Sequence, residues 1–177
     1  LRILKDSFGT LLISCGILFA GMISLILFLS CMRTKNKMKF EVRNEILLNL
    51  GIFSLLIAIW SLDQCGFMQF LVPDGRTLYY IDFFSFLLFP IPFTFLIHDI
   101  CKSKYRKGVM CLSILFMVNI ALEVILQCAG IIDIFQLLSV THILMMFSVI
   151  YTFIIIHYEA VKLENRAARE FKYPVYI

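Results

Sequence analysis

Charged residues are scarce in this chain. Only 16% of its 177 residues are Asp, Glu, Lys or Arg, while 61% are apolar and 18 are phenylalanine. Charged residues make up about a quarter of a soluble domain, and a globular chain of this length buries only about two-thirds of its surface. A water-soluble fold could not hide so many apolar side chains, and a disordered chain would hold far fewer of them. The composition therefore indicates an integral membrane protein.

Sequence patterns of the common enzyme classes are also missing. The chain contains no GxSxG, HExxH, P-loop or GxGxxG pattern, which are typical of hydrolases, zinc peptidases and nucleotide-binding proteins. Its six cysteines include no CxxC pair and no Cys–His pair with the spacing of a metal site. We therefore expect no catalytic residue, no metal ion and no cofactor within these 177 residues.

What the chain has instead is a series of long apolar runs. A membrane-spanning helix needs about 20 mostly apolar residues, and backbone polar groups are satisfied in lipid only within a helix or a closed barrel. The runs are continuous rather than alternating, which disfavours barrel strands. We therefore predict an all-α, polytopic transmembrane helix bundle, a single membrane domain over residues 1–177 that crosses the cell membrane several times. The five predicted spans are 8–32, 46–62, 78–97, 108–127 and 136–157.

The basic residues gather on one side of these predicted spans. All 16 lysines and arginines except Arg2, Lys5 and Arg76 fall between spans one and two, between spans three and four, or after span five. Positively charged loops stay in the cytoplasm, so we expect the N-terminus outside the cell. Because the clusters are short and separated by apolar runs, they favour contact with anionic lipid over nucleic acid.

The two ends of the sequence lead us to expect a piece of a longer protein. The chain begins with Leu1 rather than Met, and no signal peptide opens it. After Lys172 the sequence becomes apolar and aromatic again, and Pro174 suits the first turn of a helix. We expect the start of a sixth span there, and a frayed tail is the alternative.

Three ionisable residues interrupt the apolar spans. Asp82, Glu123 and His142 lie at a similar depth, roughly 6–9 Å below the outer boundary, and Asn119 lies one turn from Glu123 on the same helix face. Ionisable groups at such a depth tend to face a bundle interior or a wet cavity. We therefore predict that these four residues bind a ligand, a proton or a cation from outside. The alternative is shallow placement, with each group reaching the lipid headgroups separately.

The third span carries two further polar or helix-breaking features. Pro90 and Pro92 remove hydrogen-bond donors from the backbone and bend a helix, so they are predicted as a hinge, with simple packing as the alternative. His98 and Asp99 close the same span. They form either a pH-sensitive pair or a solvated helix end.

Small residues recur every four positions in the first span, at Gly16, Ala20 and Ser24. Such a stripe permits the close approach of another helix, either within the bundle or in a homodimer.

The cysteines at span ends depend on the predicted topology. Cys65 and Cys128 both fall at outer ends, so a disulfide between them is topologically allowed, whereas Cys31 and Cys101 fall at the reducing inner face. Free thiols serving as small apolar side chains are the simpler expectation. Thiol reagents should reach the inner pair from the cytoplasm and the outer pair from outside.

Four segments are distinctive as a set: LKDSFGTLLISCGILFAG, IFSLLIAIWSLDQ, YYIDFFSFLLFPIPFTFLI and LQCAGIIDIFQLLSVTHILM. Together they resemble the membrane region of bacterial seven-helix receptors with diverse intracellular signalling modules, over residues 4–156. The likeness is greatest to the Firmicutes subgroup that carries a C-terminal GGDEF diguanylate cyclase. This resemblance implies a sensing region before the first helix, two more helices after the fifth, and a cytoplasmic output domain. It also implies an outer rim of polar residues at Asp63, Gln64, Asp133, Thr141 and His142.

The function expected from these observations is sensory transduction, in which the helices carry an extracellular signal to an output domain in the same chain. No GGDEF loop occurs in residues 1–177, so any cyclase activity would belong to another part of the protein. The expected partners are the lipid bilayer, an extracellular ligand or sensing region, and a second copy in a homodimer. The alternative is a small transporter or channel subunit with a polar site at Asp82, Glu123 and His142, and a membrane-embedded enzyme ranks behind both.

Overall fold

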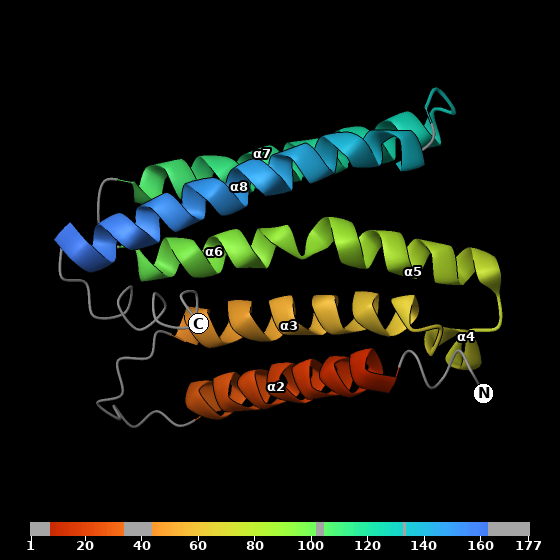
Figure 1. The fold of residues 1–177 in the computed structure, drawn as a ribbon, viewed down its shortest axis with the longest axis horizontal. Coiled ribbons are helices and arrows are strands. Elements are labelled where there is room, and N and C mark those ends of the chain that lie inside the picture. Colours follow the sequence, from red (N-terminus) through yellow and green to blue (C-terminus); the bar gives the residue numbers. More distant parts are fainter. Residues whose placement is uncertain (1–7, 34–43, 102–104, 133, 163–177) are drawn as a thin grey trace. The chain divides into compact units, whose positions relative to one another are not determined.

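The computed structural model describes residues 8–33, 44–101, 105–132 and 134–162 (Figure 1). All regular structure in these ranges is helical, which confirms the all-α class. The helices are α2 (Phe8–Arg33), α3 (Asn44–Gln64), α4 (Met68–Leu71), α5 (Gly75–Leu88), α6 (Pro90–Ile100), α7 (Arg106–Cys128) and α8 (Ile134–Lys162).

Five helical stretches are long and apolar enough to cross a membrane. Each predicted span lies wholly within one of them. Most of the helices are longer than the predicted spans, because polar residues at their ends are also helical. The predicted start of a sixth span lies outside the described residues. The five stretches are Phe8–Arg33, Asn44–Gln64, Gly75–Ile100, Arg106–Cys128 and Gln136–Lys162.

Glycines in the left-handed conformation terminate two of the long helices. Gly66 follows α3 with φ of 69°, and Gly130 follows α7 with φ of 66°. In each case the glycine N–H and the next N–H donate to carbonyl groups of the last helical turn, at 2.7–3.2 Å. This is the paired arrangement that satisfies the free carbonyls of a helix end and favours glycine there.

The third predicted span consists of two helices, α5 and α6, which meet at Phe89. Proline has no N–H to donate, so Pro90 and Pro92 weaken the hydrogen-bond ladder at this point. Phe89 N still donates to Ser85 O at 3.3 Å, and Phe93 N donates to Phe89 O at 3.4 Å. Two backbone hydrogen bonds therefore continue across Phe89, although the regular series of helical hydrogen bonds is interrupted there.

The chain divides into two compact units, Leu1–Phe93 and Thr94–Ile177. The first unit contains α2, α3, α4, α5 and the start of α6, with α2 packed along α3 and α3 along α5 (Figure 1). The second unit contains the rest of α6, together with α7 and α8, which run antiparallel along each other (Figure 1).

The face of α2 that packs on α3 differs from the predicted stripe of small residues. Gly16 and Ala20 are exposed, and a Cβ on Gly16 would meet nothing within 4 Å. The buried positions of α2 are Ser14 and Gly21, one seven-residue repeat apart, and the Ser14 hydroxyl lies 2.6 Å from the Ser61 hydroxyl of α3. The buried face of α2 thus carries a hydroxyl contact and a glycine, and the spacing of small residues in the sequence does not reveal it.

Aromatic and small residues pack the two units internally. In the first unit, the Phe53 ring of α3 lies 6.1 Å from the Phe89 ring and 5.3 Å from the Phe93 ring, between centroids. In the second unit, Gly108 of α7 leaves room for the Tyr151 side chain of α8, since a Cβ on Gly108 would overlap the Tyr151 hydroxyl.

Candidate functional site

The second unit contains a closed set of hydrogen bonds between α7 and α8. Asn119 Nδ2 donates to Glu123 Oε1 at 2.7 Å and to Thr141 Oγ1 at 2.8 Å. Thr141 Oγ1 in turn donates to Glu123 Oε1 at 2.5 Å. Asn119 and Glu123 are one turn apart on α7, so both side chains face the same point on α8. We call these three residues the Glu123 cluster.

The Glu123 carboxyl group is the unusual member of this cluster. Its side chain is only 2% exposed, and its second oxygen, Oε2, is buried without a hydrogen-bond partner. Buried polar atoms are nearly always paired, and an ionised carboxylate is costly in apolar surroundings. An unpaired oxygen on a buried carboxyl group is therefore a feature that needs a ligand, a water molecule or a proton.

His142, which the sequence analysis grouped with Glu123, does not join it. The His142 side chain is exposed, and its Nδ1 lies 2.7 Å from the carbonyl oxygen of Leu138, on its own helix. The neighbouring residue, Thr141, takes the place in the cluster. A single neutral threonine in an apolar run does not indicate a polar site. The sequence does contain one indication, because a spacing of seven, four and seven residues puts four polar residues on one face of α8, and all four are buried: Thr141, Ser148, Thr152 and Glu159.

Asp82 lies in the first unit, on α5, and has different partners. Gln64 Nε2 donates to Asp82 Oδ1 at 3.4 Å. The carboxyl group of Asp63, at the end of α3, lies near Asp82, and its Oδ1 is buried without a hydrogen-bond partner. The Gln64–Asp82 hydrogen bond thus places Asp82 of α5 beside the end of α3. Of the four predicted site residues, Asp82 therefore belongs to the first compact unit, and Asn119, Glu123 and His142 belong to the second.

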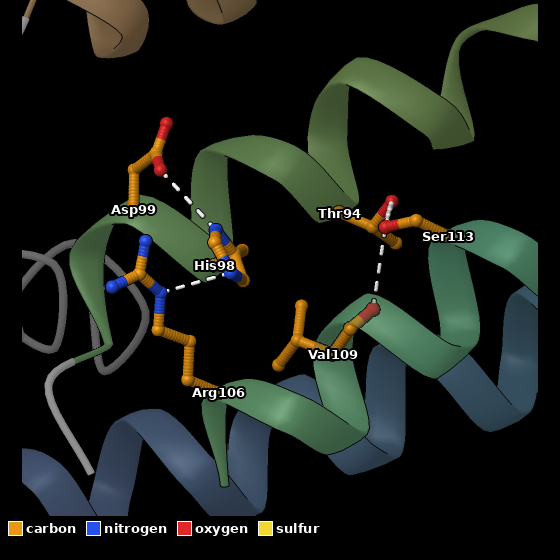
Figure 2. A network of polar contacts seen from close by, with 6 residues as sticks. All are labelled: Thr94, His98, Asp99, Arg106, Val109 and Ser113. Atoms are coloured by element: carbon orange, nitrogen blue, oxygen red, sulfur yellow. Dashed lines mark hydrogen bonds and ion pairs between the residues drawn. The ribbon is translucent and has the colours of Figure 1, made fainter. Parts of the chain in front are cut away.

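A third polar arrangement links the end of α6 to the start of α7 (Figure 2). His98 Nδ1 lies 3.2 Å from Asp99 Oδ1, and Arg106 Nε donates to His98 Nε2 at 2.8 Å. Nε2 of His98 is thus the nitrogen that faces Arg106, and Nδ1 is the nitrogen that faces Asp99. The sequence identified His98 and Asp99 as a pair but not their connection to Arg106, which lies eight residues from His98 across the loop.

The predicted hinge residues are buried. Pro90 and Pro92 both lie in the interior, in the first turn of α6. The boundary between the two compact units follows directly, between Phe93 and Thr94. On the far side of this boundary, Ser113 Oγ donates to Thr94 Oγ1 at 2.7 Å and to the Val109 carbonyl oxygen at 3.2 Å (Figure 2).

The six cysteines are free thiols in the structure. Cys101, which was expected to be open to reagents from the cytoplasm, is only 1% exposed. Burial, and next the negative charge of Glu159, raise the pKa of the Cys101 thiol to about 12, while Arg106 acts in the opposite direction. The burial of Cys101 therefore makes it a poor position for topology labelling in the folded protein.

Potential metal ligands do not gather in the part of the chain that the structure describes, where no three His, Cys, Asp or Glu side chains come together. No protein-family model, no curated protein and no solved structure matches this chain.

Proposed function

We propose that this chain is the membrane-embedded region of a sensory receptor, in which a rearrangement of helices carries an extracellular signal to a cytoplasmic output domain. The resemblance to seven-helix receptors favours a GGDEF diguanylate cyclase as that output. Signal transduction of this kind needs an element with two arrangements whose balance the stimulus changes.

The observation that carries the proposal is the place where the chain divides. Along the chain, the boundary between the two compact units falls between Phe93 and Thr94, inside α6 and directly after Pro90 and Pro92. Helix interruptions at proline are the usual positions of bending in a membrane helix. A proline-weakened helix is suited to change its bend when the balance between two arrangements shifts.

A small transporter or channel subunit is the second candidate function. It is favoured by the buried Glu123 carboxyl group, because ionisable residues inside membrane spans often mark ion pathways. The exposed position of His142 counts against the three-residue site on which this alternative was first based.

The deciding experiment expresses the natural reading frame, with any coding sequence that follows Ile177, and measures cellular cyclic di-GMP. We expect the level to rise with that reading frame and to stay at background with residues 1–177 alone. A reading frame that ends at Ile177, or that continues into more membrane helices without a soluble domain, would contradict the receptor proposal and favour the transporter.

Proline substitutions test the hinge within the same experiment. Replacing both Pro90 and Pro92 with alanine restores two backbone donors to α6, so the cyclic di-GMP level should change. Pro73, which is exposed and lies before α5, provides the matched control, and Pro73→Ala should leave the level unchanged. Equal levels in wild type and in the double variant, with both folded, would remove the hinge from the mechanism.

A further inference from the structure

The connection between α3 and α5 exposes large apolar side chains, although it is too short to cross a membrane. Phe70 is 76% exposed, Leu71 is 63% exposed and Phe67 is 38% exposed. The nine residues 65–73 include no charged side chain. Connections that face water are usually rich in polar residues, and a contiguous exposed apolar patch is typical of a surface that contacts a partner or a membrane. Residues 65–73 therefore form a surface suited to something other than water.

This segment is held against the ends of two membrane-spanning stretches. Gly66 N donates to Asp63 O at 2.7 Å and Phe67 N donates to Leu62 O at 3.2 Å, so the chain turns back on the last turn of α3. The short helix α4 contacts both α3 and α5, and it lies beside their ends (Figure 1). Because α3 and α5 belong to stretches that are long and apolar enough to span the membrane, α4 must lie close to the membrane surface.

Two exposed tyrosines mark the level of that surface on α5. Tyr79 is 40% exposed and Tyr80 is 53% exposed, and their ring centroids lie 5.8 Å apart. Tyr79 comes about one turn after α5 begins at Gly75, which is roughly 6 Å along the helix axis. Tyrosine is enriched at the level of the lipid headgroups. The start of α5 therefore lies at the boundary between membrane and water, and α4 is attached to it there.

The backbone of α4 limits how deep the segment can lie. The helix has four residues, Met68–Leu71, and Val72 N closes its single turn by donating to Met68 O at 2.8 Å. A helix of one turn cannot satisfy most of its N–H and C=O groups internally, and unpaired backbone groups are costly in hydrocarbon. The headgroup region suits it better, because apolar side chains reach the acyl chains from there while the backbone remains hydrated.

Lipid fits this surface better than a protein partner does. A stable protein interface takes about 20–30 residues from each side, whereas this segment has nine residues and three large exposed side chains. Lipid needs no complementary surface of that size. The exposed apolar surface also continues along α5, through Phe84 and Leu88, and a membrane-spanning helix presents such a surface to lipid.

We propose that residues 65–73 insert into the outer leaflet of the membrane, with the side chains of Phe70 and Leu71 among the upper parts of the acyl chains. The segment then anchors the end of α3 and the start of α5 at the same level of the bilayer. This proposal needs no output domain and stands apart from the signalling function.

Tryptophan fluorescence tests the proposal, because the chain has a single tryptophan, Trp60. With Trp60→Phe as the background, Phe70→Trp places the only indole in α4. In phosphatidylcholine nanodiscs that hold a single chain each, we expect blue-shifted emission and weak quenching by acrylamide in the water. Lipids brominated near the glycerol end of their acyl chains should quench the emission more than lipids brominated near the methyl end. Phe19→Trp is the matched control, since Phe19 is 65% exposed near the middle of α2, and bromines near the methyl end should quench it more.

Leu71→Trp in the same background gives a second reporter if Phe70→Trp folds poorly. Strong quenching by acrylamide with no quenching by either brominated lipid would overturn the proposal, because the segment would then lie in water. Protection from acrylamide and from both lipids would overturn it in favour of a protein partner. Stronger quenching by bromines near the methyl end would also overturn it, because the segment would then lie deeper than the headgroup region.

Discussion

Gly21 of α2 and Gly51 of α3 face each other at close range. A Cβ on Gly21 would stand 3.2 Å from the Gly51 carbonyl oxygen, and a Cβ on Gly51 would stand 3.3 Å from the Gly21 carbonyl oxygen. Small residues allow helix backbones to approach in lipid, where van der Waals contact replaces the hydrophobic effect as the force between helices. This glycine pair, with the Ser14–Ser61 hydroxyl contact, sets the position of α2 on α3.

Alanine at Gly21 should weaken that contact. The new Cβ would also stand 3.0 Å from Ser54 Cβ and 3.2 Å from Leu55 N, and these atoms belong to the backbone or lie next to it, so they cannot move aside cheaply. We expect Gly21→Ala to lower the free energy of unfolding by about 1–3 kcal/mol, as overpacking does in other cores. Gly16→Ala is the matched control on the same helix, since its Cβ would meet nothing within 4 Å. Titration with a denaturing detergent should separate the two variants, and equal effects would contradict the packing of α2 described here.

Asp74 should make the start of α5 sensitive to acid. The Thr77 hydroxyl and the Thr77 amide, followed by the Arg76 amide, hold the pKa of Asp74 below its ordinary value of 3.8. A carboxyl group with a lowered pKa stabilises the folded form above its ordinary pKa, and this contribution is lost as pH falls through the lowered value. Wild type should therefore lose amide protection at Arg76 and Thr77 in acid.

Two substitutions at position 74, to Asn and to Ala, separate the effect of the N-cap hydrogen bonds from the effect of the negative charge. Asparagine is also a favourable N-cap residue but does not titrate, so Asp74→Asn should keep amide protection through the acid range. Asp74→Ala should lose it at every pH. Amide hydrogen exchange measures all three proteins, and an acid-induced loss in Asp74→Asn as large as in wild type would show that another group is responsible.

Cys101 should resist thiol reagents in the folded protein. A pKa raised from 9.0 to about 12 leaves about a thousandfold fewer thiolates at neutral pH, and the side chain is only 1% exposed. Cys31 is exposed at the end of α2 and should react under the same conditions. Mass spectrometry after alkylation, before and after denaturation, reports both sites. Reaction of Cys101 at the rate of Cys31 before denaturation would contradict its burial between the helices.

The sequence alone predicted the helices well because length and composition decide them. All five apolar runs fall within observed helices, since a run of about 20 apolar residues has no other stable form in lipid. Two finer features depend on local residues and not on overall composition. The short helix α4 depends on a turn, and the break at Phe89 depends on two prolines.

The contacts between helices were harder to predict. Glu123 and Asn119 were identified correctly as neighbours, because they lie one turn apart on one helix. Thr141 was not placed with them, since periodicity does not tell how α8 is rotated against α7, and the neighbouring His142 is exposed. The rotation of α2 was missed for the same reason, as Gly16 and Gly21 look equivalent in an apolar run. Which face is buried depends on neighbouring helices, and a single sequence does not specify them.

The hydroxyl pair of Thr94 and Ser113 should stabilise the contact between α6 and α7. Both side chains are fully or almost fully buried, at 0% and 1% exposure, and their oxygens lie 2.7 Å apart. Thr94→Val removes this hydrogen bond at nearly constant volume, while Ser113 Oγ keeps its bond to the Val109 carbonyl oxygen. We expect a loss of about 1 kcal/mol in the free energy of unfolding, which is the usual size for one hydrogen bond in a protein or between membrane helices. Thr94→Ser retains the hydroxyl and should restore most of the hydrogen bond, although it leaves a small cavity. A double-mutant cycle with Ser113→Ala isolates the pair, and a coupling energy near zero would show that the two hydroxyls act independently.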